Sequence, residues 1–416
     1  MSLEIEKFGK IKHAVIETKG LTVIAGHNDT GKSTIGKIFY TLIKSQVNFP
    51  ELYDKLVNKK IALLLINPFF EFVNTLDDKS NDELIGRISD IRFRLFRLTT
   101  SEDGENDTIK DAFQIFEEYC KNHDVPSQIK ERILHLKNEY EYCATDIEKF
   151  KMIAKHYFGS VFLNNLNNSV TREPARLRYL FNNSIISDIQ INDDKITDVN
   201  FEHDKRYISY SDAVFIDTPM YLEKGHTSTT AFASDLKSKI QKALKTLENA
   251  QENDITLKIN EILRGSKFGY NEKYDDLEYR VKKDAYGLKI ANIASGSKSF
   301  GVLYLLIKTN VINKDTLIVL DEPENHLHPQ WQIDYAEILA DLVKDGYHIM
   351  LSSHSPTLIQ ALAFFARKKG IKKEAVNYYL AQKITGENYS NIQNVSDDIE
   401  KIFDNLNSPN DILYQW

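Results

Sequence analysis

The 416-residue sequence predicts an α/β protein: a mixed β-sheet with flanking helices, interrupted by a large, mainly helical insertion. Two observations predict the sheet. An apolar strand runs straight into a glycine loop near the N-terminus, and helix and strand patterns alternate over residues 298–369. The insertion is predicted because residues 51–160 change to long charged stretches with helical periodicity. We therefore expect a head formed by residues 1–50 and 180–416, with the insertion at 51–179.

The N-terminal segment predicts two strands and a helix. Residues 3–9 and 21–26 have the short apolar runs of strands, and Lys19 and Gly20 mark a turn before the second run. Apolar side chains recur at helical spacing over residues 33–42. The second strand is therefore joined to this helix by the glycine loop alone.

The periodicity of the insertion is clearest between Gln128 and Tyr157. One stripe contains the side chains Ile129, Ile133, Leu136, Tyr140 and Cys143. Two forms fit this pattern, a lid that packs on the core and a short coiled-coil hairpin. Sustained heptads are absent, which disfavours a long coiled coil.

The second half of the chain returns to the sheet. Period-two alternation predicts strands between residues 184 and 219, with a hairpin turn at Asn192, Asp193 and Asp194. Residues 230–263 are helical, and residues 268–293 predict short strands before a glycine-containing turn. Helices predicted at 298–313, 328–344 and 356–369 then alternate with strands predicted at 317–320 and 349–352.

Composition excludes several classes of protein. Hydrophobic residues make up 42% and charged residues 27%, which excludes a disordered, collagen-like or disulfide-stapled chain. A formal net charge of −7 restricts any nucleic-acid surface to a local patch. Cys120 and Cys143 fit a reducing compartment better than a disulfide framework. Since no secretory h-region and no apolar run of roughly 20 residues is visible, we expect a cytoplasmic protein with no membrane contact.

A phosphate-binding loop is predicted at residues 26–33, where GHNDTGKS fits the pattern G-x-x-x-x-G-K-[ST] between a strand and a helix. Such a loop turns backbone N–H groups inward to cradle phosphate at a helix N-terminus. Lys32 would reach the β- and γ-phosphates, and Ser33 would offer its hydroxyl to Mg²⁺. The predicted nucleotide contacts here are Gly26, His27, Asn28, Asp29, Thr30, Gly31, Lys32, Ser33 and Thr34.

Two adjacent acids end the predicted strand at 317–320. Asp321 is placed to hold the Mg²⁺ of a nucleotide, and Glu322 to polarise the attacking water as a positioning group or general base. His354 follows the predicted strand at 349–352, and its neutral ring can donate a hydrogen bond to a γ-phosphate. The catalytic residues that we predict are therefore Glu322 and His354.

These motifs resemble those of the ABC-type ATPases of the Rad50, RecF, SMC and OLD group. The likeness covers residues 3–45 and about 285–382, in FGKIKHAVIETKGLTVIAGHNDTGKSTIGK, DEPENHLHPQWQ and HIMLSSHSP. It implies an ABC-type P-loop NTPase head that binds ATP and Mg²⁺ between two copies. His354 would then be the switch histidine, and Ser295 and Gly296 the signature contacts to the partner's γ-phosphate.

The sequence departs from that pattern at two places. Many relatives carry a second glycine in the signature segment, which is missing here, and no glutamine stands at Asp217, where the Q-loop should begin. One Mg²⁺ contact is therefore unassigned. The signature residues also fit an ordinary helix N-cap. His326 and His328 form an H-x-H pair, for which loop packing is favoured over zinc because no third ligand is near in sequence.

DNA is a further candidate partner. The sequence contains two arginine clusters: Arg92, Arg94 and Arg97, and Arg172, Arg176 and Arg178. Each cluster could contact the phosphates of DNA, and each is explained equally well by a helix that faces solvent or a partner protein.

The predicted activity is Mg²⁺-dependent ATP hydrolysis by a head-to-head homodimer or a higher homo-oligomer. The layout also resembles stand-alone ATPases of bacterial anti-phage systems, such as the PARIS and Septu components. That resemblance implies an ATP-driven sensor or regulatory switch for a separately encoded effector, a nuclease or a toxin. The alternative is a DNA repair, recombination or chromosome-maintenance ATPase that binds DNA directly. The long stretch between Gly26 and Ser295 disfavours a transporter subunit, and the short segment after His354 disfavours an intrinsic nuclease.

Overall fold

The chain divides into two compact units. In this computed structural model, the described residues are 1–47, 49–74, 82–100, 107–121, 123–202, 210–223, 230–263, 266–271, 276–280 and 287–407. The head is formed by Met1–Val47 and Ala154–Trp416, and the helical unit by Asn48–Ile153. The helical unit is shorter than the expected insertion of 51–179, since residues 154–179 pack with the head.

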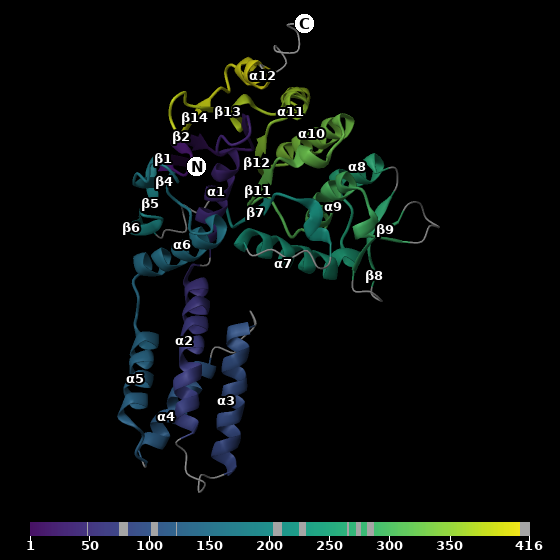
Figure 1. The fold of residues 1–416 in the computed structure, drawn as a ribbon. Coiled ribbons are helices and arrows are strands. Elements are labelled where there is room, and N and C mark those ends of the chain that lie inside the picture. Colours follow the sequence, from purple (N-terminus) through teal and green to yellow (C-terminus); the bar gives the residue numbers. More distant parts are fainter. Residues whose placement is uncertain are drawn as a thin grey trace. The chain divides into compact units, whose positions relative to one another are not determined.

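The head is built on a mixed sheet with the strand order β6-β5-β4-β1-β2-β14-β13-β3-β12-β11-β7 (Figure 1). From β13 to β7 all neighbours run parallel, whereas β2, β1, β4, β5 and β6 form antiparallel pairs. The strands are β1 (Ser2–Phe8), β2 (Ile11–Glu17), β3 (Leu21–Gly26), β4 (Ala175–Phe181), β5 (Ser184–Asn192), β6 (Lys195–Phe201), β7 (Asp212–Ile216), β11 (Thr316–Asp321), β12 (His348–Ser353), β13 (Val376–Lys383) and β14 (Ser390–Asn394).

A second, three-stranded sheet and a set of helices complete the head. The small sheet has the order β10-β9-β8, with β8 (Lys267–Asn271), β9 (Asp276–Arg280) and β10 (Leu288–Lys289). The α-helices are α1 (Lys32–Gln46), α7 (Ala231–Thr246), α8 (Asp254–Ile262), α9 (Ser295–Lys308), α10 (Pro329–Lys344), α11 (Pro356–Lys368) and α12 (Glu400–Asn407). Helix α6 (Asp146–Phe162) contains residues of both units.

Local sequence explains the central elements. Every residue of β3 is buried, as is typical of a parallel strand covered on both faces. Helix α1 packs closely on two neighbouring strands, because an added Cβ on Gly36 would lie 2.6 Å from Val319 and 3.4 Å from Phe215. The predicted hairpin turn is confirmed, with Asp193 and Asp194 at φ 47° and 59° between β5 and β6. The predicted α/β fold is thus confirmed.

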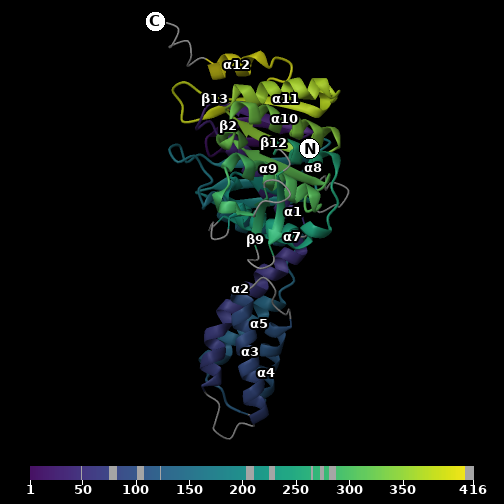
Figure 2. The same cartoon turned by 90° about the vertical axis from the view of Figure 1, so that its right-hand side faces the viewer.

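The helical unit has its own apolar core. Helices α2 (Phe49–Val73), α3 (Asp82–Thr100), α4 (Thr108–Cys120) and α5 (Ser127–Glu141) lie side by side in Figures 1 and 2. At its centre the Phe72 ring packs edge-on against Phe116 and Tyr119, with centroids 5.2 and 5.3 Å apart. The unit is therefore a small bundle rather than a single hairpin.

The predicted stripe from Gln128 to Tyr157 is broken between α5 and α6. Thr145 caps the start of α6 reciprocally with Glu148. The Thr145 N–H donates to Glu148 Oε2 at 2.8 Å, and the Glu148 N–H donates to Thr145 Oγ1 at 3.3 Å. Cys143, expected on the apolar stripe, is exposed. Over the described part of the chain, none of the helices combines the length and apolar character needed to span a bilayer.

Candidate active site

The predicted site residues converge at one edge of the head sheet. Strands β3, β12, β11 and β7 are consecutive, parallel neighbours. Their carboxyl ends therefore meet at a single edge, which is where parallel α/β sheets bind ligands. The segments that leave these ends are the P-loop, His354, the Asp321–Glu322 pair and Asp217.

The P-loop depends on glycine at two positions. Gly26 has φ 151°, and an added Cβ would lie 2.4 Å from the Ala381 carbonyl oxygen. Gly31 has φ 87° and directly precedes α1. The loop is closed on itself, because Thr30 Oγ1 and Lys32 Nζ each donate to the His27 carbonyl oxygen at 2.8 Å. Lys32 is only 4% exposed, so its ammonium is held inside the loop.

The other P-loop residues lie around this turn. Asn28 is exposed, and Ser33 and Thr34 are half-buried in the first turn of α1. Asp29 has φ 65°, and hydrogen bonds from Lys10 and Lys383 hold its carboxyl pKa below the usual value. These two cations offset a negative charge that would otherwise repel phosphate.

The acids after β11 are fixed by their neighbours. Asp321 accepts a hydrogen bond from the Ser352 hydroxyl. Glu322 has φ 48°, a costly conformation for a non-glycine residue, and its N–H donates to the Ser352 carbonyl oxygen at 3.0 Å. Burial disfavours charge on Glu322, but the Asn325 amide, 3.2 Å away, and the nearby Lys32 outweigh it and lower its pKa. Glu322 is therefore ionised at neutral pH.

A second glutamate, Glu324, hydrogen-bonds residues 353–355, the histidine loop, and so holds this loop at the sheet edge. It is 5% exposed, and its Oε1 accepts hydrogen bonds from Ser353 Oγ at 2.7 Å, His354 N at 2.8 Å and Ser355 N at 3.2 Å. His354 Nδ1 lies 3.3 Å from the same oxygen and 3.6 Å from Glu322 Oε1. Sequence reasoning missed Glu324, although a third acid two residues after Glu322 was the available signal.

The signature segment lies at the start of α9. Ser295 is half-buried at the first position of this helix. Gly296 is buried, and an added Cβ would lie 2.8 Å from the Trp331 ring and 2.9 Å from the His326 carbonyl oxygen. His328 caps α10, since its Nδ1 accepts from the Gln330 N–H at 3.4 Å. The two histidines thus belong to the turn beside α9 and α10.

The oxygen donors at the edge fit Mg²⁺. Asp321 and Ser33 offer a carboxylate and a hydroxyl, and Mg²⁺ is usually held by one or two carboxylates together with substrate phosphates. Within the described ranges, no group of three or more His, Cys, Asp or Glu could hold a metal by itself. Asp217 follows β7 beside Asp321; burial, and then the charge of Asp321, raise its carboxyl pKa.

The second arginine cluster, Arg172, Arg176 and Arg178, forms ion pairs with acids of the head. Arg176 binds Asp188 through two nitrogens, at 2.8 and 2.5 Å. Arg178 lies 3.0 Å from Glu4 and 2.7 Å from Glu6, and Arg172 pairs with Asp194. These pairs would compete with any phosphate, which weakens the expectation of DNA contact there.

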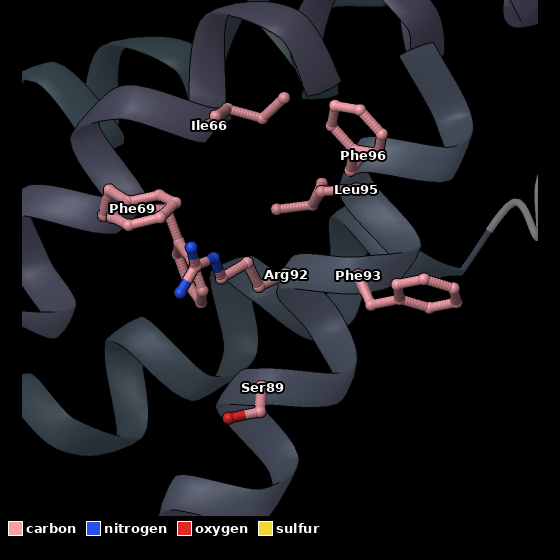
Figure 3. Close-up of a pocket in the computed structure, with 8 residues that line it drawn as sticks. Ile66, Phe69, Ser89, Arg92, Phe93, Leu95 and Phe96 are labelled. Atoms are coloured by element: carbon pink, nitrogen blue, oxygen red, sulfur yellow. The ribbon is translucent and has the colours of Figure 1, made fainter. Parts of the chain in front are cut away.

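Arg92 of the first arginine cluster borders a cavity of about 380 Å³ in the helical unit (Figure 3). Arg92 lies over the Phe70 ring at 3.7 Å from its centroid. Phe93 and Phe96 are 62% and 60% exposed beside it. This surface is mainly apolar.

A family comparison agrees with this geometry. The model of the AAA ATPase domain family matches residues 1–359. The chain belongs to this family. The predicted likeness to ABC-type ATPases of the Rad50 and SMC group is thereby confirmed, since the P-loop and the Asp321–Glu322 motif lie within the match and meet at one sheet edge. Among curated proteins, none matches this AAA ATPase domain protein.

Remote similarity extends to solved SMC heads. The SMC head domain from Thermotoga maritima is 11% identical, with 95% of this chain and 98% of that chain covered and a TM-score of 0.38. The SmcHead bound to the C-winged helix domain of ScpA is 10% identical, with coverages of 96% and 98% and a TM-score of 0.45. The Smc head of Pyrococcus yayanosii, with its coiled coil and joint, is 11% identical, with coverages of 98% and 99% and a TM-score of 0.39.

Proposed function

We propose that this AAA ATPase domain protein hydrolyses ATP with Mg²⁺ at the carboxyl edge of its parallel strands. One observation carries the proposal: Glu322 Oε1 lies 3.5 Å from Lys32 Nζ and 3.6 Å from His354 Nδ1. A cation, a carboxylate and an imidazole thus come together from three separate strand ends. Transfer of a phosphoryl group to water requires charge stabilisation and an oriented nucleophile, which these groups can supply.

Each residue has a distinct role in this reaction. Ser33 and Asp321 would hold Mg²⁺, which would supply positive charge to the phosphate oxygens. Backbone N–H groups at the start of α1 cradle the phosphates, and the Lys32 ammonium adds a second positive charge. Glu322 accepts a hydrogen bond from the attacking water and orients it, while His354 donates a hydrogen bond to the γ-phosphate.

The active form that we propose is a head-to-head homodimer. Ser295 is half-buried at the N-terminus of α9, where the helix dipole favours phosphate, and it would contact the nucleotide of the partner copy. Gly296 keeps this turn packed under Trp331. ATP would close the dimer and hydrolysis would open it, which makes the cycle a mechanical switch.

Replacing Glu322→Gln tests the reaction and the dimer together. The variant keeps the groups that bind ATP but loses the carboxylate that orients water, so we expect turnover to fall about 100-fold or more. Light scattering should show an ATP-dependent doubling of mass. The control is Glu374→Gln, an exposed glutamate outside the site, which should hydrolyse ATP at the wild-type rate. Unchanged turnover in Glu322→Gln would refute the assignment.

The biological setting rests on the resemblance to stand-alone anti-phage ATPases. We propose that the switch acts in the cytoplasm and controls a separately encoded effector, a nuclease or a toxin. The test is phage plating on cells that carry the gene with its neighbours. Protection that disappears in Glu322→Gln would support this setting. ATPase activity stimulated by DNA, without protection, would instead support the repair, recombination or chromosome-maintenance alternative.

A further inference from the structure

Helix α3 of the helical unit is apolar on two faces. The face that packs into the core is at most 7% exposed and contains Ile88, Ile91, Leu95 and Leu98. A second face carries Phe93 and Phe96, which are 62% and 60% exposed. A helix of a small bundle normally turns charged and polar side chains toward solvent on the side away from the core. The second face of α3 is therefore built like a contact surface.

A groove lies between this second face and α2. Its volume is about 380 Å³, and its lining includes Phe93 and Phe96 of α3 and Ile66 and Phe70 of α2 (Figure 3). Leu63 of α2 is 63% exposed and precedes Ile66 and Phe70 by three and seven residues, so it shares their helical face. Both helices therefore border the groove with apolar side chains over about two turns.

Arg92 supplies a positive charge to this groove. Its guanidinium lies 3.7 Å from the centroid of the Phe70 ring, and Figure 3 shows the side chain extending from α3 toward α2. On the same helix, Arg94 is neutralised by Asp90 and Asp111. Within the described ranges, Arg92 forms no ion pair with a carboxylate. Stacking on a ring uses the face of a guanidinium and leaves the N–H donors at its edge for an incoming carboxylate.

The charge of the groove distinguishes between possible occupants. A phosphate backbone needs several cations, whereas Arg92 is the one cation among the described residues of the lining. A second copy that docked face to face would present the same surface, Arg92 included. Of the acids nearest to the groove in sequence, Asp90 already pairs with Arg94. Glu71 likewise pairs with Arg132. A partner that brings its own carboxylate therefore fits this groove better than either.

We propose that this groove binds an amphipathic helix of a partner protein, which inserts an apolar side chain between α2 and α3 and pairs an acidic side chain with Arg92. A groove between two helices accepts a third helix whose anchoring side chains recur every three or four residues. Burial of the apolar anchors supplies most of the affinity, and the charge pair selects against basic helices. The groove lies within the helical unit, so the inference does not depend on the proposed ATPase function.

The probe is a library of helical peptides, randomised at positions i, i+3, i+4 and i+7, displayed on yeast and selected on the full chain. The enriched peptides should share an apolar side chain with Asp or Glu one turn away. The most enriched peptide is then synthesised with a fluorescent label, and its affinity is measured by anisotropy. Phe93→Ala should weaken binding about tenfold or more, because it removes an apolar contact at the centre of the groove.

A charge swap tests the role of Arg92. Arg92→Glu should weaken binding of the acidic peptide about tenfold, and a peptide with Lys in place of its acid should recover the affinity for this variant. The matched controls lie on α5, outside the lining. Leu134→Ala removes a 37% exposed apolar side chain and Lys130→Ala an exposed cation, and both should bind as the wild type does.

Three results would overturn the proposal. The selection could recover no binding peptide, the selected peptide could bind Phe93→Ala as tightly as the wild type, or the Lys peptide could fail to recover affinity for Arg92→Glu. Light scattering without nucleotide tests the second copy as occupant. We expect the wild type and Phe93→Ala to have the same mass; a wild-type dimer that Phe93→Ala converts to a monomer would assign the groove to a second copy and refute the partner helix.

Discussion

The head and the helical unit use charged side chains differently. In the head, Lys32 and Glu324 are 4% and 5% exposed. Lys32 donates to the His27 carbonyl oxygen of its own loop and lies 3.5 Å from Glu322, while Glu324 accepts a hydrogen bond from His354 N. In the helical unit, Arg94 pairs with Asp90 and Asp111 at a more exposed surface. Exposed pairs of this kind contribute about 0–1 kcal/mol each. Of these two places, the sheet edge is the one that concentrates desolvated charge, which is the property that a phosphoryl-transfer site needs.

This contrast teaches how to weigh a charged motif in sequence. The arginine clusters and the P-loop lysine are equally conspicuous in the sequence. Arg176 is neutralised by Asp188 across a strand pair, whereas Lys32 is surrounded by loop backbone and Glu322. Burial and partners, rather than the density of charge, separate the functional cation from the structural one.

The mutation with the largest expected effect tests whether the helical unit unfolds independently of the head. Phe72 is fully buried at the centre of the helical unit, so Phe72→Ala should lower the unfolding free energy of this unit by about 3–5 kcal/mol. Calorimetry should show the helical unit melting earlier, with ATP turnover at low temperature unchanged. Phe93→Ala, at a 62% exposed position, serves as the control and should stay within about 0.5 kcal/mol. If Phe72→Ala also lost ATP turnover, the two units would not be independent and this prediction would be contradicted.

The next effect concerns the buried cation of the head. Lys32→Ala removes the charge that would contact the phosphates and leaves Glu322 without its nearest cation. Affinity for ATP should fall about 100-fold, which corresponds to roughly 2.7 kcal/mol. Titration with a fluorescent ATP analogue measures it. Lys12→Ala, which loses only an exposed pair with Glu387, should bind as the wild type does. Intact affinity in Lys32→Ala would refute the P-loop interpretation.

The smallest effect tests how the histidine loop is positioned. Glu324→Ala leaves the Ser353 hydroxyl and the His354 and Ser355 N–H groups without this acceptor. The unfolding free energy should fall by about 2 kcal/mol, and kcat should fall more than ATP affinity, because the loss misplaces His354 after binding. Glu324→Gln keeps an acceptor oxygen and should recover part of both losses. Equal kcat in wild type and Glu324→Ala would show that His354 does not depend on this carboxylate.

The sequence alone determined the local elements of this protein. The strand, glycine loop and helix at residues 21–46, and the acids after an apolar strand at Asp321 and Glu322, are patterns between near neighbours in the chain. Periodicity and turn chemistry act over a few residues, so these elements could be predicted. The same reasoning missed the break at Thr145, because it followed the apolar stripe and not the cap between Thr145 and Glu148.

Only the tertiary structure decided which of these residues meet. The order β3-β12-β11-β7 places Asp217 beside Asp321, and it brings Glu324 under the His354 loop. Sheet order and register depend on packing between segments that are distant in the chain, and no local pattern encodes them. The burial that leaves Asp217 Oδ1 without a hydrogen-bond partner among the described residues is likewise a property of the packed edge. The motifs could therefore be predicted from the sequence, whereas the tertiary structure determines which residues contact them.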